Sequence, residues 1–585
     1  MQLPPQGDHM PVTPLSDGDH QNTSVTPESK SRQSGDDSLD TRNRRSFLGK
    51  LGGLTAAGWT ATAIGLSPLL APHEAAAQTD SAHGPEDRLA RAFFLRRDAA
   101  LHDRQAGMPA HPNNGDESRY HNSIGNFSKG LPHNGLGEVD PQAYHSLLEA
   151  VNSGQPEHFE KILLGGEVKL VNPQAGLAFD LEGFDSHQFA ESPSPALASA
   201  QRSAEAVEVY WQALLRDVNF ADYSTNATAL QACAELTSLA AFTGPKHHGR
   251  VTPQTLFRGF TAGDVIGPHI SQFLLQPINF GALPITQQFT TYLPGIDYLA
   301  DITSWMAARN GQGPFAPNSK DSVLRYLRNG RDTAAWVHVD ALFQAYFHAL
   351  LWLLGNSVPF NAGNPYNSSR TQAGFGTFGG PHVIALMSEI SSRALKAQWF
   401  QKWYVHRALR PEEFGGLVHW TRTGAANYPL HRNILHSQAV AEVFTRTGTY
   451  LLPQAYPEGC PQHPAYGSGH STVAGACVTI LKAFFNADNL AFPNPMAPSE
   501  DGLSLIPYTG SDAGQMTLTG ELHKLAANIG IARDHAGIHW RSDYEHSLLL
   551  GEAVAISVLS DQHNCYNESF RGLTFTKFDG TSITI

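Results

Sequence analysis

The chain has 585 residues, which is too long for one small domain, and its apolar content of 41% is ordinary for a globular protein. Its formal net charge of −13 disfavours a surface that binds nucleic acid or an anionic membrane. A cluster of cations in such a chain therefore requires a specific local reason.

The N-terminal part has the composition of an extension followed by a targeting segment. Residues 1–43 are rich in Ser, Asp, Pro and Gln, which is typical of disorder. Residues 44–77 resemble a twin-arginine signal peptide, with an arginine pair, a weakly apolar stretch and a small-residue cleavage site. This predicts export of the folded protein to the periplasm or the outside. A transmembrane anchor is the alternative, but the high Gly, Ala and Thr content predicts no stable anchor.

The remaining chain, residues 86–585, has a mostly helical pattern. Long runs such as 196–215, 322–354 and 381–409 carry apolar residues at three- and four-residue spacing. Alternating patterns typical of strands are scarce and are limited to short patches near 574–585. We predict an all-α fold with two cores that resemble four-helix bundles, connected by long loops.

Two cations lie near the end of one predicted helix. The run 381–409 is predicted to form this helix, since Pro381 suits a first turn and Pro411 would end it. Lys402 and Arg410 lie eight positions apart, about 80° around a helix, which directs both towards one site at its C-terminal end. Taken alone, these cations also suit the negative end of a helix dipole.

A glycine-flanked turn follows in the sequence Gly467-Ser468-Gly469-His470, just before an apolar helix predicted over 471–485. Glycines at a helix N-terminus allow backbone N–H groups to approach an anion closely, and a serine there can donate or cap. An ordinary N-cap turn is the alternative for this segment taken alone.

The third segment contains Arg533, His539 and Asp543. The last two are four positions apart, which would place them on one face of a helix. A carboxylate there can accept a hydrogen bond from one imidazole nitrogen and leave the other free as a ligand or nucleophile. A surface His–Asp pair is the alternative. Together, the three segments predict a site for a tetrahedral oxyanion with acid–base chemistry.

The order and spacing of these segments resemble the superfamily of vanadium-dependent haloperoxidases and type-2 phosphatidic acid phosphatases. The spacing of Lys402 and Arg410 is similar to that of red-algal bromoperoxidases, whereas the phosphatases usually have seven positions. Residues 401–407 and 374–380 and the total length also resemble algal and bacterial haloperoxidases. The resemblance is strongest over about 320–560, the expected catalytic part. One departure is Gly467, where many members have proline.

The resemblance implies vanadate as the cofactor. His539 would be the vanadium ligand, with Asp543 orienting its ring, and His470 would be the acid–base residue. Lys402 would also polarise hydrogen peroxide. The groups that would neutralise or hydrogen-bond the vanadate oxygens are Lys402, Arg410, Ser468, Gly469 and Arg533.

The implied activity is oxidation of bromide and iodide by hydrogen peroxide to hypohalous acid, which halogenates a small organic acceptor. A phosphatase is the alternative, in which His539 would attack phosphorus and His470 would protonate the leaving group. A non-enzymatic oxyanion-binding protein is a third possibility, but it leaves His470 without a role. The algal relatives form large assemblies, so a homo-oligomer is expected. The stretch 361–372 has no carboxylate, so we expect no calcium site there.

Two residues near the motifs predict a halide pocket of mixed character. His463, seven positions before His470, resembles the red-algal bromoperoxidases. Trp399, three positions before Lys402, instead resembles fungal chloroperoxidases. Simple helix packing is the alternative for Trp399. Because His463 is closer in sequence to the acid–base residue, we expect bromide and iodide oxidation with slow or absent chloride oxidation.

Overall fold

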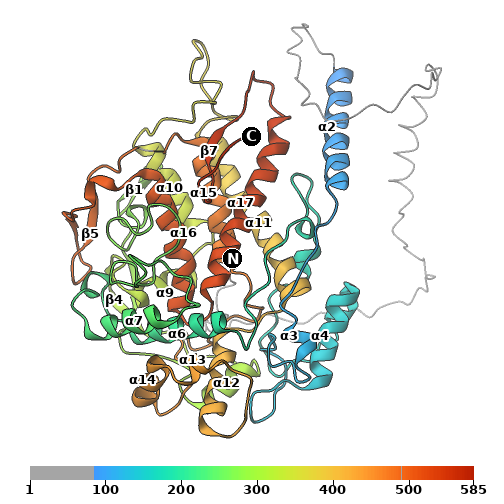
Figure 1. The fold of residues 1–585 in the computed structure, drawn as a ribbon. Coiled ribbons are helices and arrows are strands. Elements are labelled where there is room, and N and C mark those ends of the chain that lie inside the picture. Colours follow the sequence, from blue (N-terminus) through green and yellow to red (C-terminus); the bar gives the residue numbers. More distant parts are fainter. Residues whose placement is uncertain (1–84, 489) are drawn as a thin grey trace, which may run out of the picture. The chain divides into compact units, whose positions relative to one another are not determined.

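The computed structural model describes residues 85–488 and 490–585 (Figure 1). The predicted extension 1–43 and signal peptide 44–77 lie outside the described residues. The α-helices of the described part are α2 (Pro85–Ala106), α3 (Asp116–Arg119), α4 (Pro141–Ser153), α5 (Pro156–Phe159), α6 (Ala200–Leu214), α7 (Ala227–Ser238), α8 (Ile302–Arg309), α9 (Gly330–Val339), α10 (Gln344–Gly355), α11 (Gly380–Phe400), α12 (Pro411–Thr423), α13 (Arg432–Leu435), α14 (Gln438–Thr447), α15 (Gly469–Phe484), α16 (Leu518–His535) and α17 (Arg541–His563).

The strands of the described residues are short and form four two-stranded antiparallel sheets. The predicted all-α class is therefore confirmed, and the expected strand patch near the C-terminus is the β7–β8 hairpin, in which Phe575 pairs with Ile583. The strands are β1 (Ile278–Phe280), β2 (Leu283–Ile285), β3 (Phe289–Tyr292), β4 (Lys320–Arg325), β5 (Met496–Pro498), β6 (Leu505–Pro507), β7 (Thr574–Thr576) and β8 (Ser582–Thr584).

The larger helical core is built around α15, which is buried along its whole length. Helices α11, α16 and α17 pack directly against it (Figure 1). The backbones of α15 and α17 approach closely at two glycines. A Cβ atom on Gly475 would lie 2.0 Å from the Leu548 carbonyl oxygen, and one on Gly551 would lie 1.9 Å from that of Thr472. This close packing fixes the N-terminus of α15 relative to α17.

A second core lies among α6, α7, α12 and α14, which gather in the lower part of Figure 1. Its apolar side chains include the fully buried Trp211 of α6 and Val418 of α12. Trp540, the residue before α17, joins this core and donates its indole N–H to the Leu409 carbonyl at 2.8 Å. The segments that flank Arg410 and His539 are thus anchored in the same apolar core.

The predicted single helix 381–409 is wrong in its last part. Helix α11 ends at Phe400, a π-helical segment η5 (Gln401–His406) follows, and Arg407 with φ 39° leaves the helix in the left-handed region. Pro411 does not end this helix but begins α12, where its missing N–H costs no helical hydrogen bond. Lys402 and Arg410 therefore lie on separate elements.

The run 322–354 also differs from one continuous helical pattern, since it contains the end of β4 and the two helices α9 and α10. Asn329 starts α9 by accepting a hydrogen bond from the Asp332 N–H at 2.9 Å. The extended backbone of Asp340, with φ −64° and ψ 149°, ends α9. This short helix is what places Asp340 and Val337 beside the predicted site.

Within the described residues, no single helix is long and apolar enough to cross a membrane. The pair α9 and α10 meets the length and composition criteria only when taken together, and it is bent by 97°.

Candidate oxyanion site

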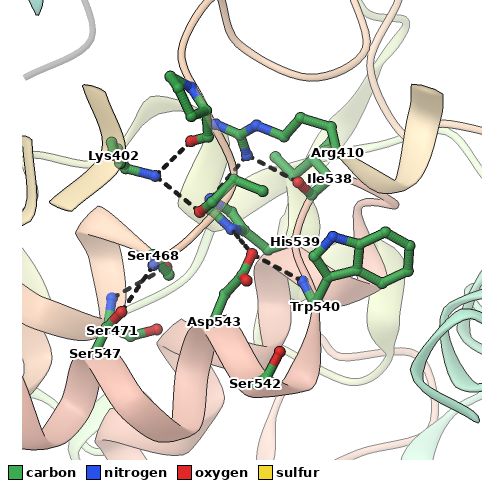
Figure 2. A network of polar contacts seen from close by, with 12 residues as sticks. Lys402, Arg410, Ser468, Ser471, Ile538, His539, Trp540, Ser542, Asp543 and Ser547 are labelled. Atoms are coloured by element: carbon green, nitrogen blue, oxygen red, sulfur yellow. Dashed lines mark hydrogen bonds and ion pairs between the residues drawn. The ribbon is translucent and has the colours of Figure 1, made fainter. Parts of the chain in front are cut away.

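The three sequence segments meet in the structure at the start of α15 and α17 (Figure 2). Lys402 comes from η5, Arg410 from the residue before α12, and Ser468 from the N-cap of α15. The side chains of the predicted site residues in this region are at most 8% exposed. The predicted residues that lie in this region are Lys402, Arg410, Ser468, Gly469, His470, Arg533, His539 and Asp543.

His539 and Asp543 form a close pair, but not on one helix face as predicted. His539 lies before α17, and Asp543 is in the first turn of that helix. The Asp543 carboxylate reaches back to His539 Nδ1 at 2.6 Å and also accepts from the Trp540 N–H at 3.2 Å. Burial raises the pKa of Asp543 to about 6, although the charges of Arg202 and Lys402 oppose the shift. The pair fixes the imidazole plane and occupies Nδ1, so only Nε2 can serve as a ligand, and a ligand there would replace its 2.9 Å contact with Arg410 Nη1.

Arg410 lies against the free side of this imidazole. Its Nη1 is 2.9 Å from His539 Nε2 and donates to the Ile538 carbonyl at 2.8 Å. Its Nε donates to the His463 carbonyl at 2.9 Å, and its Nη2 is 2.9 Å from His463 Nδ1. Burial lowers the pKa of Arg410 to about 10. The guanidinium is thus held by carbonyl oxygens and imidazole nitrogens.

Lys402 is fully buried, and its Nζ donates to two successive carbonyls, those of Pro464 at 2.7 Å and Ala465 at 2.9 Å (Figure 2). Burial lowers the pKa of this amine well below its usual value, and the nearby Arg410 charge lowers it further. An ammonium has three donors, so one N–H of Lys402 remains for a ligand.

Arg533, near the end of α16, completes the set of cations. Its Nη1 donates to the Val337 carbonyl at 2.6 Å. Its Nε is buried and has no hydrogen-bond partner among the described residues. A buried donor without a partner carries a cost of about 1–3 kcal/mol, so it points to a ligand at this position.

The residues present fit an oxyanion such as vanadate. Lys402, Arg410 and Arg533 are at most 2% exposed, and their protein acceptors in the described residues are carbonyl oxygens and imidazole nitrogens rather than carboxylates. Three buried cations without a carboxylate partner are unfavourable on their own, because burial removes their hydration. A multiply charged tetrahedral anion supplies the missing countercharge and accepts the unused donors.

The glycine-flanked turn leads directly into the predicted helix, which begins at Gly469 rather than at Ser471. Ser468 is the N-cap of α15, and its Oγ accepts from the Ser471 N–H at 3.3 Å. Its own N–H donates to Ser547 Oγ at 3.0 Å. Gly469 is the first helical residue, and a Cβ atom there would lie 3.1 Å from the ring of Trp399. The first turn of a helix offers N–H groups and a positive dipole end to an anion.

Sequence reasoning missed the partner of His470, which is Asp340. Its Oδ1 lies 3.0 Å from His470 Nε2, and its Oδ2 is buried and has no hydrogen-bond partner within residues 85–488 and 490–585. Burial lowers the pKa of His470, the Asp340 carboxylate raises it, and the Arg533 charge lowers it. Asp340 is 130 positions away in the chain, so no local motif links the two residues.

Known proteins resemble the chain over most of its length. It is 35% identical to the vanadium-dependent bromoperoxidase of Corallina officinalis over 559 residues, which cover 81% of this chain and 92% of that protein. The chain belongs to the vanadium-dependent bromoperoxidase family. It is also 34% identical to the vanadium-dependent bromoperoxidase of Ascophyllum nodosum, covering 82% of this chain and 89% of the relative.

Two further comparisons concern the fold. The homohexameric structure of the second vanadate-dependent bromoperoxidase from Ascophyllum nodosum superimposes with a TM-score of 0.82 at 32% identity, covering 89% of this chain and 94% of that one. Residues 442–568 match the family model described as the VCPO second helical-bundle domain. These residues contain α15, α16 and α17, the helices that hold His470, Arg533 and Asp543.

In this member of the bromoperoxidase family, the two predicted halide-pocket residues face each other. The ring centroids of Trp399 and His463 are 4.8 Å apart, with an angle of 38° between the rings. Lys402 Nζ lies 5.7 Å from the centroid of the Trp399 ring. The indole N–H of Trp399 donates to the Val171 carbonyl at 3.0 Å, and its side chain is only partly buried. Trp399 therefore flanks Lys402 and His463, and it also packs against the apolar cluster that contains Leu147 of α4 and Trp403, so both interpretations of this residue stay open.

Proposed function

We propose that the chain is a vanadate-dependent haloperoxidase that uses hydrogen peroxide to oxidise bromide, and iodide, to hypohalous acid. The hypohalous acid would then halogenate small organic acceptors. One observation carries the proposal: three buried cations, none of which has a carboxylate partner in the described part of the chain, lie near an imidazole whose Nδ1 is held by a carboxylate at 2.6 Å. The named activities of the relatives support the same function.

In this proposal, His539 Nε2 is the vanadium ligand, because the other ring nitrogen is hydrogen-bonded to Asp543. Lys402, Arg410 and Arg533 would balance the charge of the oxygens, and Ser468 and Gly469 would donate to them. Bound vanadate would act as a Lewis acid that activates hydrogen peroxide for attack by the halide, without a change in the oxidation state of the metal.

His470 and Lys402 would perform the proton chemistry and polarisation at this site. Asp340 engages His470 Nε2, so Nδ1 is left to take a proton from hydrogen peroxide as it binds and to return one to the product. Lys402 holds a fixed position on two carbonyls and keeps one donor for a peroxide oxygen. The low exposure of both side chains keeps bulk water away from these groups.

The experiment that tests this function compares two reactions on one preparation. Protein freed of oxyanions is incubated with or without vanadate, and bromination of a β-diketone by hydrogen peroxide and bromide is measured beside hydrolysis of an aryl phosphate. We expect bromination only in the vanadate-loaded protein. Phosphate-ester hydrolysis without vanadate-dependent bromination would assign the site to the phosphatases instead, and binding without either reaction would indicate an oxyanion-binding protein.

We also propose that residues 44–77 direct export by the twin-arginine route to the periplasm or the outside. The support is the sequence pattern of Arg44-Arg45, a weakly apolar stretch and Ala75-Ala76-Ala77. The test is a fusion of residues 1–77 to a fluorescent protein that fluoresces only when folded before export. We expect periplasmic fluorescence that is lost when both arginines are changed to lysine. Unchanged export of that variant would contradict the route.

A homo-oligomer is proposed as the working form. The relative from Ascophyllum nodosum is homohexameric in its structure. In this chain, α2 carries exposed apolar side chains, including Leu89 at 65% and Phe93 at 60% exposure, as expected of a surface that a partner covers. Light scattering on the purified protein should give a mass that is a multiple of the monomer, and a monomeric mass would contradict the proposal.

A further inference from the structure

A buried carboxylate outside the three motif segments is connected to the glycine-flanked turn. Glu191 lies between η2 (Ser186–Gln188) and α6, and it is 6% exposed. One carboxylate oxygen accepts from Ser547 Oγ at 2.9 Å, and the other accepts from Gln398 Nε2 at 3.2 Å. The two partners come from α17 and α11, which both pack against α15.

Both partners of Glu191 also form hydrogen bonds with residues at the start of α15. Ser547 Oγ accepts from the Ser468 N–H at 3.0 Å. Gln398 Oε1 accepts from Thr472 Oγ1, in the first turns of α15, at 2.6 Å. Two chains of hydrogen bonds thus run from one carboxylate to both sides of the segment that carries Gly469 and His470.

The same arrangement accounts for Gly467, which stands where many family members have proline. A Cβ atom at this position would lie 1.8 Å from Ser547 Oγ and 3.0 Å from Glu191 Oε1. Any side chain, including that of proline, would displace the link between Ser547 and Glu191. Ser192, the residue after Glu191, makes a second contact with the residues before the turn: its carbonyl accepts a hydrogen bond from Tyr466 Oη at 2.6 Å.

Glu191 also lies within the electrostatic field of the site. Burial raises the pKa of this carboxyl to about 7, while its hydrogen bonds to Gln398 and Ser547 and the charge of Lys402 lower it. Glu191 and Asp543 are the two carboxylates whose charges stabilise the Lys402 ammonium. Loss of Glu191 would therefore change both the hydrogen bonds of the turn and the charge balance next to Lys402.

We propose that Glu191 is a positioning residue of the oxyanion site, which fixes the orientation of Ser468, Gly469 and His470 through Ser547 and Gln398. Glu191 touches neither the substrate nor the cofactor in this role. The inference rests on the proposed function, because the oxyanion that the turn positions is taken to be vanadate. Its consequence is that Glu191 sets vanadate affinity and turnover more strongly than its contribution to stability would predict.

The test compares Glu191→Ala with Glu552→Ala. Glu552 is a matched control, since it is also 6% exposed and accepts from Lys482 Nζ at 3.5 Å and from the Phe578 N–H at 2.9 Å, away from the turn. The vanadate dissociation constant is measured by equilibrium dialysis of the cofactor-free protein, beside the melting temperature. We expect Glu191→Ala to weaken vanadate binding by about tenfold to a hundredfold, as for other residues that orient ligands. Glu552→Ala should lower the melting temperature without weakening vanadate binding.

Two further variants keep the test decisive if Glu191→Ala fails to fold. Glu191→Gln keeps a carbonyl oxygen for Ser547, so its vanadate affinity should lie between those of the wild type and Glu191→Ala. Ser547→Ala breaks the same link from the other side, so its effect and that of Glu191→Ala should not add in the double variant. Additive losses, or equal vanadate affinity in Glu191→Ala and Glu552→Ala, would overturn the positioning role. Failure of the wild type to bind vanadate would instead overturn the proposed function.

Discussion

Asp340 Oδ1 and His470 Nε2 lie 3.0 Å apart, and this contact joins the end of α9 to the start of α15. The carboxylate favours the protonated imidazole, whereas burial and the Arg533 charge favour the neutral one. The balance of these effects sets the pH at which His470 changes charge, and it makes Asp340 the residue through which that pH can be shifted.

Asp340→Asn is expected to lower the pKa of His470, because it removes a negative charge that raises it. Activity that requires neutral His470 falls as the pH drops through this pKa, so the acidic limb of the profile should move to lower pH. The measurement is kcat/KM for hydrogen peroxide as a function of pH, which reports groups of the free enzyme. The exposed Asp98→Asn serves as the control, and an acidic limb that stays in place in Asp340→Asn would contradict this role of Asp340.

His539→Ala should abolish vanadate binding and bromide oxidation while the protein stays folded, because the helical cores do not depend on this side chain. Asp543→Ala should weaken vanadate binding by about tenfold to a hundredfold, since it leaves the ligand in place but releases the 2.6 Å contact to Nδ1. Equilibrium dialysis measures the vanadate binding of each variant, and circular dichroism shows whether the variant is folded. Full vanadate-dependent activity in His539→Ala would disprove the ligand assignment.

Phosphate is expected to compete with vanadate during reconstitution of the cofactor-free protein. Both anions are tetrahedral and similar in size, and the three cations recognise charge and shape rather than the central atom. The measurement is the rate and extent of recovery of bromination at increasing phosphate concentration. Nitrate of equal ionic strength, a planar and singly charged anion, controls for general salt screening. Recovery that is insensitive to a large excess of phosphate would mean that vanadate binds elsewhere.

The start of α15 could be predicted from sequence because its determinants are local. A serine followed by an apolar helical pattern indicates an N-cap, and Ser468 caps α15 in the structure. The structure brings Lys402 and Arg410 into one region, but the α-helix predicted to contain Lys402 ends at Phe400. Arg407 adopts φ 39°, and its Nε donates to Glu117 Oε1 at 2.8 Å. This ion pair joins residues 290 positions apart, and such a contact overrides the local helical pattern.

Asp340 and Glu191, which support the site, could not be predicted from the sequence, because their contacts also join distant parts of the chain. Asp340 follows a short helix, and Glu191 lies in an irregular segment, so neither belongs to a periodic pattern or a motif. Their roles arise only when α11 and α17 pack against α15 and α9 packs against α16. The one local signal was Gly467, whose departure from the family pattern reflects the space taken by Ser547 and Glu191.

The halide preference should follow from the contact between Trp399 and His463. His463 is fixed by Arg410, with Nδ1 at 2.9 Å from Nη2, and burial lowers the pKa of its ring well below the usual value. A neutral imidazole next to Arg410 and Lys402 adds no positive charge to the activated peroxide, so this pocket favours halides that are easily oxidised. Bromide and iodide should therefore be oxidised readily, and chloride slowly or not at all. Steady-state rates with each halide at several pH values measure the preference.

Trp399→Arg and His463→Phe separate the two contributions to this preference. His463→Phe should raise the ratio of chloride to bromide turnover, because it replaces the polar ring beside Trp399 with an apolar one and removes an acceptor for Arg410. Trp399→Arg should leave bromide oxidation largely intact and add a cation near Lys402. Chloride turnover equal to that of bromide in the wild type would assign the preference to Trp399, and Trp399→Arg would then lose chloride activity selectively.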